Sequence, residues 1–224
     1  MDGVWSDVTE ERVVVGDRSL LVLLPRDSEA LIDEERFARE EFLPYWAELW
    51  PSARALACAV AELPFAGLAV TELGCGLGLP SLVAAAAGAR VLASDWAPEA
   101  LPFVAENARR NGVVVDLLEC SWAEPAALVA RGPFDVVLAS DVLYERANVP
   151  LIAALLPRLV RCGGLVLLAD PGRPALDAFL AAMAAAGWAT VSGAPVEGGR
   201  VVVHRLEPPP AGPAAGEART RRIA

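Results

Sequence analysis

Lysine is absent from this sequence: all nineteen basic residues among its 224 positions are arginines. Walker-type phosphate loops, Schiff-base enzymes and lysine nucleophiles each need that residue, so these three classes are excluded. Histidine is almost absent as well. The single histidine, His204, lies in the last predicted strand, so we expect it to be structural and expect no His-based catalytic triad.

Cysteine is scarce and scattered. Cys58, Cys75, Cys120 and Cys162 form no CxxC pair, which argues against a disulfide framework and against a zinc site. Apolar runs are shorter than the ~20 residues of a membrane-spanning helix, and the N-terminus lacks the basic and apolar regions of a signal peptide. We therefore expect a cytoplasmic protein with no bound metal and no membrane partner.

Positive charge is in short supply. The 29 acidic residues outnumber the 19 basic ones and give a formal net charge of −10. A nucleic-acid binder needs a basic surface, and the body of the chain shows none, so we predict no nucleic-acid partner. Apolar residues make up 55% of the chain, which is enough for the core of one large domain. The sequence does not specify an oligomeric state.

A glycine-rich stretch, Val70–Pro80, organises the rest of the chain. It joins a buried strand, a tight loop with Gly74, Gly76 and Gly78, and the start of a helix. Glycine lets the backbone turn sharply and approach a ligand, and N–H groups at the helix start point toward the loop. Nucleotide-like ligands bind at this place in α/β sheets; three turn glycines in an ordinary strand–helix connection are the alternative.

Glu72 precedes these glycines, and its charge helps to distinguish between two classes of ligand. Its carboxylate repels a pyrophosphate but suits a ligand with a cationic amino-acid part. S-adenosyl-L-methionine carries an ammonium and a sulfonium and has no phosphate. The spacing Gly-x-Gly-x-Gly, followed by Leu79 and Pro80, also departs from the dinucleotide pattern. We therefore predict S-adenosyl-L-methionine as the cofactor, with NAD(P) as the disfavoured alternative.

Strand and helix patterns alternate from residue 69 onward. Strands are predicted over 69–73, 90–94, 113–118, 134–139 and 165–169, helices over 81–87, 98–111, 124–130, 149–161 and 174–186, and a closing antiparallel pair over 188–192 and 200–206. This order predicts an α/β fold with a doubly wound, seven-stranded, mostly parallel sheet of Rossmann-like topology.

The segments before and after this predicted sheet domain do not continue its strand–helix alternation. Residues 1–43 form a predicted extension, with a hairpin over 11–24 and a helix over 29–41. Residues 44–206 form the predicted sheet domain, which opens on an aromatic-rich stretch and a helix over 52–62. Residues 207–224 begin with a proline run, and we expect a disordered tail there.

Side chains at the ends of the predicted strands are candidate ligands. Asp95 ends the second strand, where a carboxylate accepts two hydrogen bonds from a ribose diol; a helix N-cap is the alternative. Ser121 and Trp122 follow the third strand and are expected to flank an adenine, with plain packing of Trp122 as the alternative. Asp141 and Tyr144 follow the fourth strand at the mouth of the cleft. There Asp141 holds a substrate amine or, alternatively, caps a turn.

Five segments together resemble the seven-strand S-adenosylmethionine-dependent methyltransferases: Pro44–Ser52, Glu72–Gly78, Ser94–Trp96, Ser121-Trp122 and Phe134–Glu145. More narrowly, Asp141-Val142-Leu143-Tyr144 matches the Asp/Glu-x-x-Tyr/Phe motif of a protein-lysine methyltransferase group. Pro44–Pro51 and Asp170-Pro171-Gly172-Arg173 are similar to the electron-transfer-flavoprotein β-subunit lysine methyltransferases and their bacterial relatives. The glycine loop and Ser121-Trp122 look more like other members of the group.

The resemblance implies a donor site built from the glycine loop and the strand ends: Trp50, Glu72, Gly74, Gly76, Gly78, Asp95, Trp96, Ser121, Trp122 and Ser140. In that site Glu72 lies near the ammonium of the donor, Asp95 binds its ribose, and Trp96 and Trp122 flank its adenine. In the same resemblance, Asp141 and Tyr144 contact the methyl acceptor.

We therefore predict an S-adenosylmethionine-dependent methyltransferase that N-methylates lysine side chains of a protein by direct displacement. Asp141 orients the amine and Tyr144 forms a wall of the acceptor channel. No dedicated base is needed, because burial and the nearby sulfonium both favour the neutral amine. The alternatives are a small-molecule N- or O-methyltransferase on the same fold and a non-catalytic domain that keeps the fold for partner binding.

Overall fold

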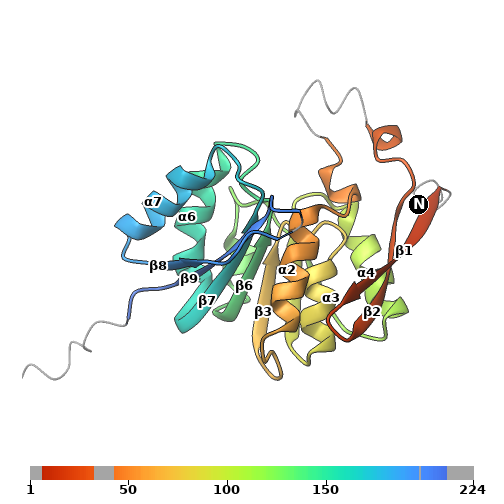
Figure 1. Cartoon of the computed structure of the whole chain (residues 1–224), viewed down its shortest axis with the longest axis horizontal. Coiled ribbons are helices and arrows are strands. Elements are labelled where there is room, and N and C mark those ends of the chain that lie inside the picture. The colour runs from red at the N-terminus through yellow and green to blue at the C-terminus, as the bar shows by residue number, and fades with distance from the viewer. Residues whose placement is uncertain (1–6, 33–42, 197, 211–224) are drawn as a thin grey trace, which may run out of the picture.

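A seven-stranded sheet runs through the centre of the computed structural model, which describes residues 7–32, 43–196 and 198–210 (Figure 1). In chain order its strands are β3 (Ala69–Leu73), β4 (Arg90–Asp95), β5 (Asp116–Glu119), β6 (Phe134–Ser140), β7 (Val160–Asp170), β8 (Ala189–Ser192) and β9 (Val202–Glu207). Their spatial order is β5-β4-β3-β6-β7-β9-β8. Neighbours from β5 to β7 are parallel, whereas β9 runs antiparallel to both β7 and β8. The predicted fold class is confirmed.

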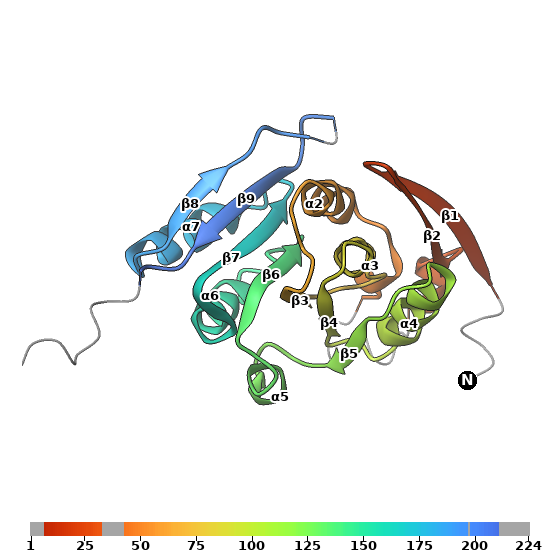
Figure 2. The ribbon, with the colours of Figure 1, turned by 90° about the horizontal axis from the view of Figure 1, so that it is seen from below.

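Helices cover both faces of the sheet (Figure 2). One face carries α2 (Pro51–Ala61), α3 (Leu79–Ala86) and α4 (Ala100–Arg110), and the other carries α5 (Ala126–Val129), α6 (Asn148–Leu159) and α7 (Leu176–Ala185). Alternate side chains of a strand point to opposite faces. In β6, Val136 and Leu138 accordingly join the core under α2, α3 and α4, whereas Val137 and Ala139 join the core under α6 and α7. No helix in the described ranges is long and apolar enough to cross a bilayer.

A β-hairpin, β1 (Val8–Val15) and β2 (Arg18–Pro25), packs beside α4. The hairpin predicted over 11–24 is therefore present and a few residues longer. Two asparagines one helical turn apart satisfy the free edge of β2. The Asn107 side chain accepts from Leu23 N at 2.7 Å and donates to Leu23 O at 3.2 Å. Asn111 pairs with both backbone groups of Leu21 in the same way, at 2.9 and 2.7 Å. The two amides thus imitate a neighbouring strand and protect an exposed edge.

Replacing Asn107 by leucine should lower the free energy of unfolding by about 3 kcal/mol, because three buried backbone groups lose their partner. Besides the two groups of Leu23, the amide of Asn107 donates to Leu77 O at 3.1 Å, in the glycine loop. Urea unfolding monitored by tryptophan fluorescence measures the change. Asn111→Leu is the matched control. Asn111 is only half-buried, so water replaces its bonds and the loss should be about 1 kcal/mol. Equal losses in the two variants would contradict the argument.

Some predicted boundaries differ from the structure. The third strand begins at Asp116 rather than at residue 113, because Gly112 adopts a φ of 65° and Val113 N donates back to Ala108 O, which closes α4. The fifth strand begins at Val160, directly after α6, because Val160 already pairs with Phe134. The predicted helix over 29–41 shows a 3-10 turn, η1 (Glu29–Leu31), and residues 33–42 lie outside the described part. Most of the predicted tail, residues 211–224, lies outside it as well.

Candidate active site

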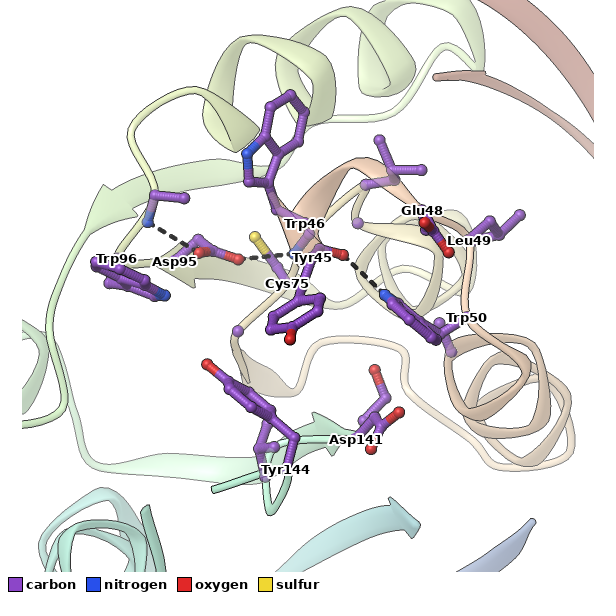
Figure 3. A pocket seen from close by; sticks show the side chains of 18 of the residues that line it. Tyr45, Trp46, Glu48, Leu49, Trp50, Cys75, Asp95, Trp96, Asp141 and Tyr144 are labelled. Carbon is purple, nitrogen blue, oxygen red and sulfur yellow. Dashed lines mark hydrogen bonds between the residues drawn. The ribbon is translucent and has the colours of Figure 1, made fainter. Parts of the chain in front are cut away.

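A cavity of about 300 Å³ opens at the carboxyl ends of β3, β4 and β6, beneath the short 3-10 helix η2 (Tyr45–Ala47) (Figure 3). Parallel strands meet at this edge, which is where open α/β sheets bind ligands. Most of the predicted site residues line the cavity: Trp50, Gly74, Gly76, Gly78, Asp95, Trp96, Trp122, Ser140, Asp141 and Tyr144. Glu72 and Ser121 do not.

The glycine loop is shaped by backbone conformation and by close packing. Gly74, Gly76 and Gly78 all have positive φ, at 61°, 50° and 79°. A Cβ at Gly78 would lie 2.8 Å from a methyl carbon of Val104 in α4, and one at Gly76 would lie 3.2 Å from Trp46 O. A side chain at Gly78 would clash with Val104, one at Gly76 would be tight against the backbone of Trp46, and the positive φ would strain both.

Glu72 lies behind the loop rather than in the cavity, which differs from the predicted contact with a ligand ammonium. Its side chain is fully buried. Ser81, in the first turn of α3, donates to Glu72 Oε2 from both its backbone N, at 3.0 Å, and its Oγ. Burial raises the pKa of Glu72 to about 8. The carboxyl is therefore mostly protonated at neutral pH and ties β3 to α3.

Replacing Glu72 by glutamine should remove a pH dependence of stability. The folded protein keeps the Glu72 proton up to about pH 8, whereas the unfolded chain releases it near 4.5. Stability of the wild type therefore falls as pH rises between those values, by an amount on the order of 5 kcal/mol from this residue. Urea unfolding at several pH values should show that decline in the wild type and a flatter profile in Glu72→Gln. Parallel profiles would contradict the assignment.

Asp95, at the end of β4, lines the cavity and also holds the loop. Its Oδ2 accepts from Gly76 N at 2.9 Å and its Oδ1 accepts from Ala97 N at 3.0 Å. Burial raises the pKa of Asp95, and the backbone hydrogen bonds oppose that rise. Because a carboxylate already occupies a loop N–H that a pyrophosphate would need, the arrangement disfavours a dinucleotide. The helix N-cap considered as the alternative is not observed, because α4 begins at Ala100 with Glu99 as its N-cap, and Asp95 instead closes a local turn through Ala97 N.

The tryptophan and the serine after β5 point in different directions. The Trp122 ring lies against the glycine loop, where a Cβ on Gly74 would meet it at 3.2 Å, and it lines the cavity. Ser121 is exposed, and its Oγ accepts from Ala123 N at 3.3 Å. The structure therefore brings Trp122 into the site and leaves Ser121 outside.

Aromatic rings line the side of the cavity near Asp141 (Figure 3). The Tyr45 ring contacts the Tyr144 ring edge-on, with centroids 5.5 Å apart, and lies 6.2 Å from the Trp50 ring. Trp50 Nε1 donates to Tyr45 O at 2.7 Å and so fixes the two residues relative to each other. Burial raises the pKa of Tyr144 to about 12, so its phenol stays protonated. Electron-rich faces of this kind attract cations.

Asp141 carries the most unusual backbone in the site. Its φ is +55°, in the left-handed region that few non-glycine residues adopt, and its N donates to Ala169 O of β7 at 2.9 Å. Its carboxylate is engaged by Arg173, whose Nε and Nη2 donate to the two oxygens at 2.7 and 2.8 Å. Asp141 and Arg173 both line the cavity.

Sequence reasoning did not include Arg173 and Tyr45 among the site residues. A signal for Arg173 was available. Asp170-Pro171-Gly172-Arg173 follows a strand whose parallel neighbour ends at Asp141, so the two strand ends had to meet at the same edge of the sheet. Tyr45 lies in the aromatic-rich stretch before α2, and its direction depends on how η2 folds back over the loop.

Comparison with known proteins agrees with this geometry. The sequence profile of a family described as lysine methyltransferase matches residues 47–185. The ubiquinone biosynthesis O-methyltransferase of Rhizobium etli is 35% identical over 122 residues, which cover 54% of this chain and 48% of that protein. The protein N-lysine methyltransferase METTL21A of Danio rerio is 33% identical over 130 residues, which cover 54% of this chain and 59% of that protein. The chain thus spans about half the length of the curated relatives it matches.

A solved structure supports the same fold. The 16S rRNA N2 G1207 methyltransferase of T. thermophilus, in complex with AdoMet and guanosine, superimposes with a TM-score of 0.65 at 17% identity. The superposition covers 91% of this chain and 51% of that one. At this identity the likeness concerns the fold alone. It agrees with the Rossmann-like α/β topology described above.

Proposed function

Because the chain belongs to the lysine methyltransferase family, we propose that it transfers a methyl group from S-adenosyl-L-methionine to the side-chain amine of a lysine in a protein. The observation that carries this proposal is the meeting, in one cavity, of a glycine loop with an aromatic-walled carboxylate. The loop suits a donor without phosphate, and Asp141 beside Tyr45 and Tyr144 suits an amine acceptor with an aliphatic stem.

The residues around the glycine loop fit the donor. Asp95 presents a buried carboxylate to the cavity, as a ribose diol requires, and its charge favours a cationic ligand. The bare backbone at Gly76 and Gly78 leaves room for close approach. Trp96 and Trp122 offer rings for the adenine, and Ser140 and Trp50 line the cavity as well. The bound donor would supply a methyl group on a sulfonium sulfur.

The acceptor side follows from the chemistry of displacement. A lysine nitrogen forms its bond to the methyl carbon while the bond from that carbon to sulfur breaks, and the product amine loses its proton to solvent. An amine starts with a pKa of ~10.4 and must be neutral when it attacks. We assign Asp141 to hold the amine, and Tyr45, Trp50 and Tyr144 to enclose the lysine stem and exclude water.

A labelling assay tests the proposal. The purified protein is incubated with a cell lysate and S-adenosyl-L-methionine labelled in its methyl group, and labelled proteins are identified by mass spectrometry. We expect methylated lysine in one or a few proteins. Because the chain contains no lysine, its own side chains give no lysine background. Donor binding by calorimetry without labelling of any protein lysine would refute the proposed acceptor.

A second candidate, a small-molecule N- or O-methyltransferase, is favoured by one observation. The Arg173 guanidinium lines the cavity and offers a partner to an anionic metabolite. Label that appears only in the small-molecule fraction of the lysate would establish this function instead. A protein that binds no donor would be the third candidate, a non-catalytic partner-binding domain.

The wider organisation is proposed on the same basis. Residues 44–206 are assigned to the methyltransferase domain, residues 1–43 to an extension, and residues 207–224 to a tail. None of the four cysteines takes part in a disulfide, which agrees with a cytoplasmic location. The expected partner is a protein substrate, with no nucleic acid and no membrane.

A further inference from the structure

Asp141 and Arg173 form an ion pair at the mouth of the cavity. Both guanidinium nitrogens that face the carboxylate donate to it, Nε at 2.7 Å and Nη2 at 2.8 Å, one to each oxygen. The side chain of Asp141 is 10% exposed and that of Arg173 is 35% exposed. A two-point pair of this kind fixes geometry as well as charge. Asp141 is therefore paired before any acceptor amine arrives.

The backbone holds both partners in place. Asp170, fully buried at the end of β7, accepts from Gly172 N and Arg173 N, each at 2.7 Å, and so shapes the turn that presents the guanidinium. Asp141 is anchored through its N to Ala169 O of the same strand, with a φ of +55°. Strained backbone is kept where surrounding structure enforces it. The pair is thus built into the ends of β6 and β7.

The pairing matters because of the charge state that methyl transfer needs. An unpaired carboxylate next to a lysine stabilises the ammonium and raises the pKa of the amine, which opposes attack. A guanidinium held on that carboxylate cancels this effect. The oxygens of Asp141 still have lone pairs for a hydrogen bond from the acceptor, so orientation is kept while the proton is given up more easily.

We infer that Arg173 is a positioning residue of the acceptor site: it neutralises Asp141, so that Asp141 orients the acceptor amine without holding it as an ammonium. The inference rests on the proposed transfer to lysine. Nothing in it requires a general base, because solvent takes the proton.

Several other titratable or charged groups face the pair or the cavity: Tyr45 and Glu48 from the η2 segment, Asp95 from β4, Tyr144 and Glu145 after β6, Asp170 from β7, and His204 from β9 behind Asp170. Burial raises the pKa of Tyr144 to about 12 and lowers that of His204. The Asp141 carboxylate raises the pKa of Arg173, which keeps its charge. The variants below change only Arg173 and Asp141 and leave the other listed groups in place, so differences between the variants report on the ion pair.

The test is the pH dependence of the single-turnover rate at saturating acceptor, with the acceptor protein found in the labelling assay. In Arg173→Gln the midpoint of the acidic limb should rise by about one unit, so the rate below it falls about tenfold and recovers at high pH. In Asp141→Asn the midpoint of the residual rate should fall. In the double variant, which has neither charge, it should return to within about 0.3 unit of the wild type.

The affinities give a second readout. The KM for the acceptor should decrease in Arg173→Gln, because the uncompensated carboxylate binds the ammonium form more tightly, while kcat at neutral pH falls. Donor affinity by calorimetry should stay within about threefold of the wild type, since Arg173 lies on the acceptor side. Arg173→Met, also uncharged, should give the same midpoint and replaces the glutamine variant if that one unfolds.

Two results would overturn the inference: a rate loss in Arg173→Gln that is equal at every pH, and a double variant whose midpoint stays with that of Arg173→Gln. Either would mean that the arginine acts only on local structure. Failure of the proposed function is recognised separately, because then the wild type itself methylates no protein lysine.

Discussion

Asp95→Ala should weaken binding of S-adenosyl-L-methionine by about 100-fold or more, which isothermal calorimetry measures directly. Hydrogen bonds from neutral groups to a carboxylate contribute about 1.5–3 kcal/mol each, and a ribose diol would donate two of them. The variant also frees Gly76 N, which Asp95 Oδ2 holds at 2.9 Å, so the loop loses one of its fixed points. Both effects act on the donor half of the cavity.

A matched control separates this loss from a general effect of removing an acidic residue. Asp116 starts β5 next to β4, is exposed and does not line the cavity, so Asp116→Asn should leave donor affinity within about threefold. Thermal melting verifies that Asp95→Ala is folded. Unchanged donor affinity in folded Asp95→Ala, or tight binding of NAD in place of S-adenosyl-L-methionine, would refute the assigned donor site.

Asp141→Ala should keep donor binding and lower methyl transfer to the acceptor protein by about 100-fold or more, because the amine is no longer held for attack. The label incorporated per minute at saturating donor measures the effect. Asp141 lies next to the aromatic wall of Tyr45 and Tyr144, away from the oxygens of Asp95 (Figure 3). Asp95→Ala should therefore lose affinity for the donor, whereas Asp141→Ala should lose the rate of methyl transfer.

The backbone at Asp141 calls for its own control. Alanine at a φ of +55° costs about 1–2 kcal/mol, which could lower activity through local distortion. Asp141→Gly adopts this φ without strain and should lose transfer to the same extent. Full transfer activity in either variant, together with lost donor binding in Asp95→Ala, would show that the acceptor assignment is wrong.

The fold and the donor loop could be predicted from local sequence signals. Apolar alternation and glycine stops placed all seven strands of the sheet, and the predicted first strand, 69–73, coincides with β3. The glycines of the loop, and Asp95, Asp141 and Tyr144, could be brought to one edge from sequence because carboxyl ends of parallel strands meet there. Within the sheet domain the errors lie at the ends of elements. At β5, for example, the turn that closes α4 includes residues of strand-like composition.

Other features required the folded chain. Glu72 precedes the glycines in sequence, yet its side chain points into the interface with α3, where burial raises its pKa to about 8 and removes the negative charge assumed for it. Ser121 and Trp122 are adjacent, but only Trp122 faces the cavity. In an irregular segment, packing decides the direction of each side chain, so adjacent residues can point to opposite sides. The sequence alone does not predict those directions.

The order of strands and helices, the loop at the first crossover and the motif after β6 could be predicted from residue order alone, because they depend on periodicity and on residues close together in the chain. The pairing of groups far apart in the chain became visible only in the folded protein. Asn107 completes the edge of β2 across 84 residues, and Arg173 neutralises Asp141 across 32. Such pairs depend on strand register and on the angle at which a turn leaves its strand, so they exist only once the sheet has formed.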